Sequence, residues 1–175
     1  GEIAVYSGTN PASASTWSLV GVYKVGKPLN KHSSFQAGGD VAIITEDGII
    51  PVSAATKKDR AALQMDAITY PIEDAWQDVV FNRSADYPVS ATLWQSATML
   101  IVGTPDPDVA FVSNARTGAW CRFTGWDVRC GAVFGDDFYF GSEDGTISIA
   151  ETGGSDQGVA YAARWVPKFS EAGNA

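Results

Sequence analysis

The sequence predicts a mainly β protein in which antiparallel β-meander units form the blades of a β-propeller-like fold, with a short helical insertion. Three observations carry this prediction. The 175 residues include 18 Gly, six Trp, six Tyr and eight Phe, but only 18% are charged, a composition typical of short strands joined by turns. Two long segments repeat each other. Only one stretch has a helix-forming pattern.

The internal repeat relates residues 2–50 to residues 108–147. Each copy begins with a short strand-forming run and continues through a loop into a run that contains a Trp. Each then ends in a hairpin with the tripeptide Glu-Asp-Gly. A tight hairpin turn requires a residue that tolerates a positive φ. The predicted turn residues are Asp47, Gly48, Asp144 and Gly145. Units of about 40–50 residues have the length of one propeller blade.

Strands are expected where aromatic or β-branched residues form a short run between turn residues. The expected strands are residues 2–7, 17–25, 40–45, 48–53, 89–94, 97–103, 108–114, 119–124, 126–133, 137–141, 145–150 and 159–166. The runs 41–44 and 138–140 are apolar throughout rather than alternating. Such runs are typical of strands covered on both faces, as in stacked sheets. Three Trp residues at strand positions are expected in the blade core rather than on a sugar- or base-stacking surface; they are Trp17, Trp120 and Trp126.

Residues 54–86 interrupt the β pattern, and we divide the chain into a first β unit (1–53), the helical insertion (54–86) and further β units (87–175). One helix is expected over residues 57–65 with Thr56 as its N-cap. A second is expected over residues 71–80, where apolar residues recur at helical spacing. The exposed basic residues of the insertion are candidates for contact with a neighbouring subunit: Lys57, Lys58 and Arg60. The abrupt ends of the repeat suggest a piece of a longer chain.

Catalytic patterns are weak in this sequence. Cys121 and Cys130 fit neither a CxxC redox pair nor a zinc pattern, so we expect free thiols, with a disulfide across neighbouring strands as the alternative. His32 lies in a polar loop, and no Gly-x-Ser-x-Gly elbow accompanies it. Glycoside cleavage needs two carboxylates that face one sugar, whereas the adjacent carboxylates here fall in predicted turns. These pairs are Glu46/Asp47, Asp136/Asp137 and Glu143/Asp144.

Other polar segments are interpreted as ordinary turns, so no metal, cofactor or catalytic residue is expected. Asp106–Asp108 and Ser155–Gly158 offer oxygen atoms but match no calcium-binding loop. Gly38–Asp40 lacks the Lys-Ser/Thr pair of a phosphate-binding loop. The net charge of −8 argues against a surface that grips nucleic acid. No apolar run approaches the roughly 20 residues that cross a bilayer, and no membrane contact is expected.

Three runs resemble tail-associated structural proteins of short-tailed bacteriophages and related prophages. They are Tyr70–Trp76, Ser113–Asp127 and Phe134–Gly145, and the resemblance extends over most of the chain. It implies a tail nozzle or tail-tube protein with propeller-like β domains. Such proteins assemble as a ring, usually a hexamer, below the portal and adaptor, and DNA leaves through the channel. The family supplies no catalytic residues. Its members are usually several hundred residues long, so ring-forming and channel-lining parts would lie outside this piece.

The resulting expectation is a virion structural protein, made in the bacterial cytoplasm and located in the tail, that forms part of a DNA exit conduit. Its expected partners are further copies in a ring and other tail or adaptor proteins. DNA would pass without specific binding because acidic walls repel phosphate. Two alternatives stay open. One is a carbohydrate-binding or glycan-cleaving propeller for host receptor recognition. The other is a protein-interaction propeller, although Trp126-Asp127 is the lone Trp-Asp pair and no regular repeat signature is present.

Overall fold

The computed structural model describes residues 1–84, 86–155 and 158–160. The protein is mainly β, with 41% strand and 15% helix, and its sheets are antiparallel, which confirms the predicted class. The strands are β1 (Glu2–Gly8), β2 (Trp17–Lys24), β3 (Ser34–Ala37), β4 (Asp40–Thr45), β5 (Gly48–Pro51), β6 (Ser90–Trp94), β7 (Met99–Gly103), β8 (Val109–Asn114), β9 (Trp120–Thr124), β10 (Cys130–Phe134), β11 (Asp137–Gly141) and β12 (Ile147–Ile149). The helices are α1 (Val52–Ala55), α2 (Arg60–Leu63), η1 (Gln64–Asp66), η2 (Tyr70–Ile72) and α3 (Glu73–Phe81).

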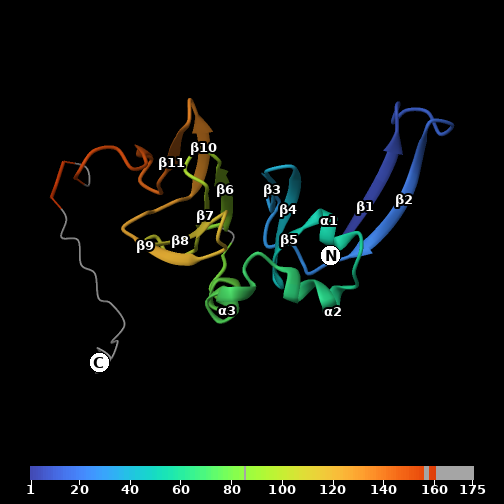
Figure 1. Cartoon of the computed structure of the whole chain (residues 1–175), viewed down its shortest axis with the longest axis horizontal. Coiled ribbons are helices and arrows are strands. Elements are labelled where there is room, and N and C mark those ends of the chain that lie inside the picture. The colour runs from blue at the N-terminus through green and yellow to red at the C-terminus, as the bar shows by residue number, and fades with distance from the viewer. Residues whose placement is uncertain (85, 156–157, 161–175) are drawn as a thin grey trace, which may run out of the picture.

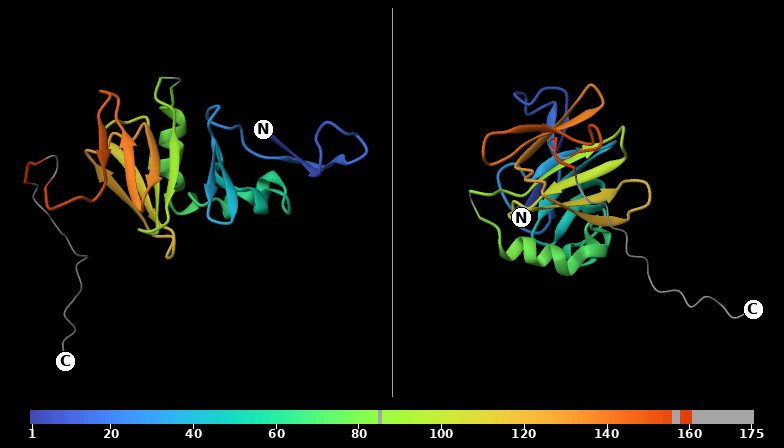
Figure 2. Two further views of the ribbon diagram at one scale, coloured as in Figure 1. Left: turned by 90° about the horizontal axis from the view of Figure 1, so that it is seen from above. Right: turned by 90° about the vertical axis from the view of Figure 1, so that its left-hand side faces the viewer.

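The strands form four consecutive sheets within the described residues: β1-β2, β3-β4-β5, β6-β7-β8-β9 and β10-β11-β12. Each sheet is a meander of sequence neighbours joined by short connections. Figures 1 and 2 show them following one another along the long axis of the molecule, with the β1–β2 ribbon at one end and the β10–β12 sheet at the other. Strand β6 lies beside both β3 and β10, so the first strands of three sheets are neighbours.

The central strands of the four-stranded sheet, β7 and β8, are covered on both faces, which explains why they are largely apolar, whereas the edge strands β6 and β9 carry polar residues. One face packs against the β3–β5 sheet and α3 in a cluster that includes Ile44, Trp76 and Val102. The opposite face packs against the β10–β12 sheet in a cluster that includes Ile101 and Phe138. Stacked sheets are present, and burial of these faces is the main source of stability available to such a chain. The expectation that the runs 41–44 and 138–140 are covered on both faces is wrong, because Val41 is 45% exposed and Tyr139 points away from the cluster that buries Phe138 and Phe140.

A third cluster lies on the far face of the β3–β5 sheet. Ile50 of β5 and Val25, just after β2, pack there against α1, α2 and η1 through Ala55, Leu63 and Ala67. The helical segment therefore contributes buried side chains to two of the three clusters. It is part of the packed structure, so our description of residues 54–86 as an insertion understates its role.

The first predicted helix is divided, and its predicted cap is wrong. A helical turn already begins at Val52, after the extended Pro51, and Thr56 ends it by donating its backbone N–H to the carbonyl oxygen of Val52. The N-cap of α2 is Asp59, whose carboxylate accepts from Ala62 N at 3.0 Å. A carboxylate at this position stabilises the free N–H groups of the first turn more directly than Thr56 would.

The other expected elements are largely present. Four residues of β3 were not expected, because only Phe35 in that run is a strong strand former. Residues 126–129 form a loop rather than the start of a strand, and the run 48–53 ends at Pro51 because α1 follows. The strand expected at 159–166 lies almost wholly outside the described residues. Among the helices described here, none has the length and apolar character needed to cross a bilayer.

Candidate functional site

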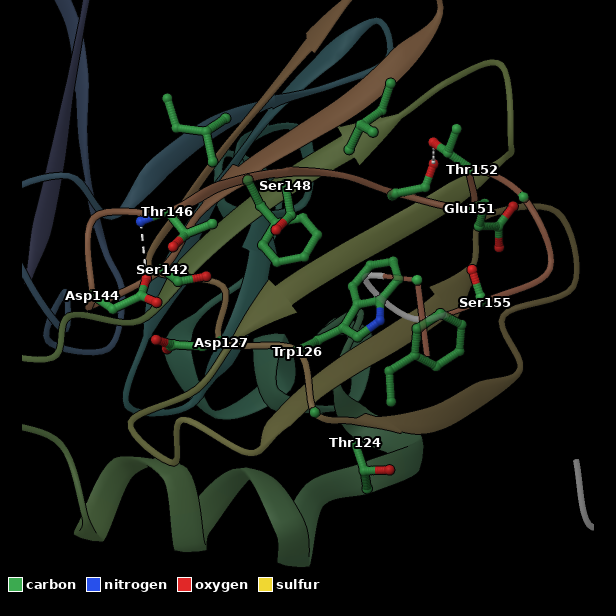
Figure 3. A pocket seen from close by; sticks show the side chains of 18 of the residues that line it. Thr124, Trp126, Asp127, Ser142, Asp144, Thr146, Ser148, Glu151, Thr152 and Ser155 are labelled. Carbon is green, nitrogen blue, oxygen red and sulfur yellow. Dashed lines mark hydrogen bonds between the residues drawn. The ribbon is translucent and has the colours of Figure 1, made fainter. Parts of the chain in front are cut away.

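A hollow of about 1490 Å³ lies beside the last sheet, between the end of β9 and the segment that follows β12 (Figure 3). Its aromatic lining consists of Phe123, Trp126 and Phe140. Its carboxylates are Asp127, Glu143, Asp144 and Glu151. Its hydroxyl groups belong to Thr124, Ser142, Thr146, Ser148, Thr152 and Ser155. Neither Lys nor Arg lines it among the described residues. The hollow therefore offers ring faces and hydrogen-bond groups to a ligand and repels anions.

The aromatic residues of the hollow also belong to the packing of the second cluster. The indole of Trp126 stacks on Phe140 with ring centroids 5.1 Å apart and meets the ring of Phe123 edge-on at 5.0 Å. Phe140 is buried, whereas Phe123 and Trp126 are half-buried. Such pairs fix the orientation of the rings. Trp126 is therefore a structural residue with an accessible part that lines the hollow.

An ionic network centred on Arg129 includes two of the carboxylates that line the hollow, Asp127 and Glu143. Its Nε lies 2.6 Å from Asp127 Oδ1, and its Nη2 lies 3.7 Å from Glu143 Oε2. The guanidinium also sits 4.4 Å from the ring centroid of Tyr87, whose hydroxyl donates to Glu143 Oε1 at 2.6 Å. The hydrogen bond with the Glu143 carboxylate raises the pKa of Tyr87. The network joins the start of β6 to the loop before β10 and the β11–β12 turn.

This network makes Asp127 and Glu143 poor candidates for acid–base catalysis. Glu143 N donates to Asp127 Oδ2 at 2.7 Å, so the two residues are also linked to each other. A shared cation and a direct hydrogen bond between the two residues hold these carboxylates in fixed orientations. We did not predict Arg129 or Tyr87 as site residues, because 42 positions separate them and no local pattern links them.

The two predicted turns are present but differ in form. Glu46 and Asp47 make a two-residue turn between Thr45 and Gly48. The φ of Gly48 is +128°. Asp144 and Gly145 instead lie in a longer loop, where Asp144 Oδ1 accepts from Thr146 N at 2.9 Å. This hydrogen bond lowers the pKa of Asp144. Gly145 has a φ of +83°. All four residues are therefore structural turn residues, as expected.

The three basic residues proposed for subunit contact are used differently. Arg60 binds the first turn, with Nε 2.7 Å from Asp47 Oδ2 and Nη2 2.9 Å from Glu46 Oε1, and these partners raise its pKa. Lys58 pairs with Asp66 at 2.5 Å. Arg60 thus links the helical segment to the first turn, whereas Lys58 forms an ion pair within the segment. Of the three, only Lys57 has no ion pair within the described part of the chain.

The three predicted core Trp residues have three different environments. Trp120 is packed against the first cluster and donates its Nε1–H to Ile68 O at 3.2 Å. Trp126 packs against the second cluster. Trp17 lies on the β1–β2 ribbon, outside the three clusters, where it stacks on Tyr6 with ring centroids 5.9 Å apart. The core assignment of Trp17 is wrong, because over the described ranges its sheet has two strands and none of the three core clusters packs on that face.

The remaining candidate groups have no catalytic arrangement. Cys121 and Cys130 are both free and exposed, as expected, and partial burial raises the pKa of Cys121. The side chain of His32 makes no hydrogen bond to another described residue; its backbone N–H donates to Asn30 Oδ1 at 2.7 Å. Over the described ranges, no group of three His, Cys, Asp or Glu residues could hold a metal ion.

Comparisons with known proteins add no further assignment. No protein-family model, no curated protein and no solved structure matches this chain. Its function is therefore inferred from its own sequence and geometry.

Proposed function

We propose that the protein is an assembly component of a bacteriophage tail, in which its sheets serve as blades of a propeller-like array that forms part of a DNA exit conduit. The observation that carries the proposal is the side-by-side placement of β3, β6 and β10, the first strands of three successive sheets. In a propeller, blades radiate from a channel, so corresponding strands of successive blades are neighbours.

The internal repeat supports the same arrangement. Strands β8 and β9 are the outer half of a four-stranded sheet, and the repeat equates them with β1 and β2. The β10–β12 sheet likewise corresponds to β3–β5, since both follow a Trp-containing strand and a loop. A chain built in this way has sheets that need neighbours at both ends, which suits an assembly part better than a free enzyme.

The charge of the protein is compatible with a conduit for DNA. The net charge is −8, and three of the basic side chains, Lys58, Arg60 and Arg129, are held in ion pairs with carboxylates. Phosphate binding requires clustered cations that are available to the ligand. DNA would therefore pass without specific binding. The location in the tail rests on the sequence resemblance. So do the expected hexameric ring and the expected contacts with adaptor or other tail proteins.

Electron microscopy of the full-length protein tests this proposal. We expect rings with a central channel, and we expect peptides of this chain in purified phage particles by mass spectrometry. Filter binding should give no DNA affinity in the micromolar range at moderate salt. A protein that is monomeric in its full-length form, or that binds DNA at micromolar concentration, contradicts the proposal.

The hollow beside the last sheet favours a second candidate function, the binding of a neutral glycan for receptor recognition. Its half-buried rings and hydroxyl groups are the groups that recognise sugars, and its carboxylates would accept from sugar hydroxyls. Cleavage is not supported, because Asp127 and Glu143 are both paired with Arg129. A glycan array tests binding. Signal from the wild-type chain that is lost in Trp126→Ala but kept in Trp120→Ala supports this candidate, and a blank array rejects it.

A further inference from the structure

Each end of the row of sheets has an apolar face that no other residue of the described ranges covers with a core cluster. At one end is the β1–β2 ribbon, and at the other is the β10–β12 sheet (Figures 1 and 2). Large apolar side chains exposed together usually mark an interaction surface. The strand registers show which side chains share each face, because directly paired residues of antiparallel strands point to the same side.

On the ribbon, a β-bulge gathers the apolar residues on one face. Tyr6 pairs with Leu19 and Ala4 pairs with Val22, while Val20 is the extra residue between these pairs. The bulge keeps Leu19 and Val22 on the same side although three positions separate them. The Leu19 side chain is 52% exposed. This surface, formed by Ala4, Tyr6, Trp17, Leu19 and Val22, is called the ribbon face.

The ribbon face points away from the rest of the chain. Ile3 belongs to the opposite side of β1, and it packs against the third cluster at the base of the ribbon. The ribbon is therefore anchored by its opposite face. The N-terminal amino group adds to this anchor by donating to Val25 O at 2.8 Å.

The last sheet has a comparable outer face. Phe138 and Phe140 point inward to the second cluster, so their neighbours along β11 point outward. The outward residues include Cys130, Phe134, Tyr139, Ile147 and Ile149, and this surface is called the end face. Ile147 is 76% exposed and Phe134 is 78% exposed. Nothing in the described part of the chain packs on either side chain as a core cluster.

We propose that the ribbon face of one copy stacks on the end face of another copy, so that chains join head to tail. This inference deepens the proposed function, on which it rests, by naming the contact through which copies assemble. The contact would continue the sheet-on-sheet packing already present between β3–β5, β6–β9 and β10–β12. A contact between different surfaces of identical chains generates a ring if the rotation closes.

Charge selects a second copy as the occupant. Residues 3–23, which include nearly the whole ribbon, contain no charged side chain, and the end face contains one, Asp137 beside Phe134. The protein otherwise has a net charge of −8, so most surfaces of two copies repel each other. The chain has another uncharged stretch, residues 88–105, but it lies largely within the packed four-stranded sheet, so the ribbon is an exposed uncharged segment that can approach another copy without this repulsion. It also lacks the charged residues that commonly protect an exposed ribbon from association.

Disulfide cross-linking of the full chain tests the geometry. In a Cys121→Ser background, Cys130 is the remaining native thiol and lies on the end face. Leu19→Cys places a thiol on the ribbon face, and Ser18→Cys, its neighbour on the opposite face, is the matched control. With mixed isotope-labelled and unlabelled chains, mild oxidation should link position 19 to Cys130 between chains. The Ser18→Cys control should give little of this product.

Sedimentation provides an independent measurement. Leu19→Lys should weaken self-association of the full chain by about tenfold or more, since it removes a Leu side chain that the contact would bury and adds a charge. Ser18→Lys should change it little. Four results overturn the inference. Three are cross-links: one between two position-19 thiols, one within a single chain, or equal yields from Leu19→Cys and Ser18→Cys. The fourth is a protein that sediments as a monomer at all concentrations. If full-length rings persist while Leu19→Lys has no effect, the contact is wrong and the proposed function stands. If the head-to-tail links form but the protein is absent from phage particles, the contact is right and the proposed function is wrong.

Discussion

Replacement of Trp76 tests whether the helical segment is part of the core. The Trp76 side chain is 1% exposed, and its Nε1–H donates to the buried Thr45 O at 3.1 Å. Trp76→Ala removes a large ring from the cluster between two sheets, which should lower the free energy of unfolding by about 3–5 kcal/mol. Trp76→Phe keeps most of the ring but leaves the carbonyl without its donor, at a cost of about 1–3 kcal/mol.

The assay is urea unfolding followed by circular dichroism, since removal of a Trp alters fluorescence by itself. Phe81→Ala is the matched control, because Phe81 ends the same helix and is 87% exposed. Its cost should stay within about 0.5 kcal/mol. If Trp76→Ala costs no more than Phe81→Ala, then α3 does not belong to the core. Residues 54–86 would then be the separable insertion that the sequence pattern suggested.

Three further predictions concern turns, the ionic network and pH. A Cβ on Gly48 would lie 2.6 Å from Thr69 Oγ1 at a φ of +128°, so Gly48→Ala should cost about 2–4 kcal/mol. Gly145→Ala, which meets nothing within 4 Å, should cost only about 1 kcal/mol by the same urea assay, and equal costs would refute the packing argument. Arg129→Ala should lower stability by about 2–3 kcal/mol, because the partly buried Asp127 carboxylate loses its partner; a neutral effect in thermal unfolding would show that the network contributes nothing. Hydrogen bonding from Ser53 lowers the pKa of Asp40, so its stabilising contribution is present above about pH 4 and lost as the pH falls through the lowered pKa. Asp40→Asn should flatten the acid side of a melting-temperature profile, and an unchanged profile would exclude this cause.

Local patterns predicted much of the β structure because the responsible interactions are themselves local. The pair Asp47-Gly48 and the pair Asp144-Gly145 identified two turns without any tertiary information. The same tripeptide nevertheless takes two turn forms. Gly48 packs closely on Thr69 and Ala67, whereas Gly145 faces open space, so the tertiary environment selects the form.

The candidate site was much less predictable. Arg129 contacts Tyr87, which lies just before β6, and Glu143, which lies in the β11–β12 turn. Their approach depends on how the four-stranded sheet and the last sheet stack. The basic residues of the helical segment show the same limit. They are exposed, as their sequence pattern predicts, but the pattern did not show that Arg60 reaches back across 13 positions to Asp47.

Local sequence patterns were sufficient for the mainly β class and the positions of the turns, because each depends on short-range propensity. Tertiary structure alone decided what each repeated element packs against. Trp17 and Trp120 begin equivalent strands, yet Trp120 is packed on the first cluster and Trp17 lies on a two-stranded ribbon. The difference arises because β8 is paired with β7 as well as with β9 and has covered faces, whereas β1 pairs with β2 alone among the described residues. Burial is a property of neighbours in space, which a residue's own sequence context does not contain.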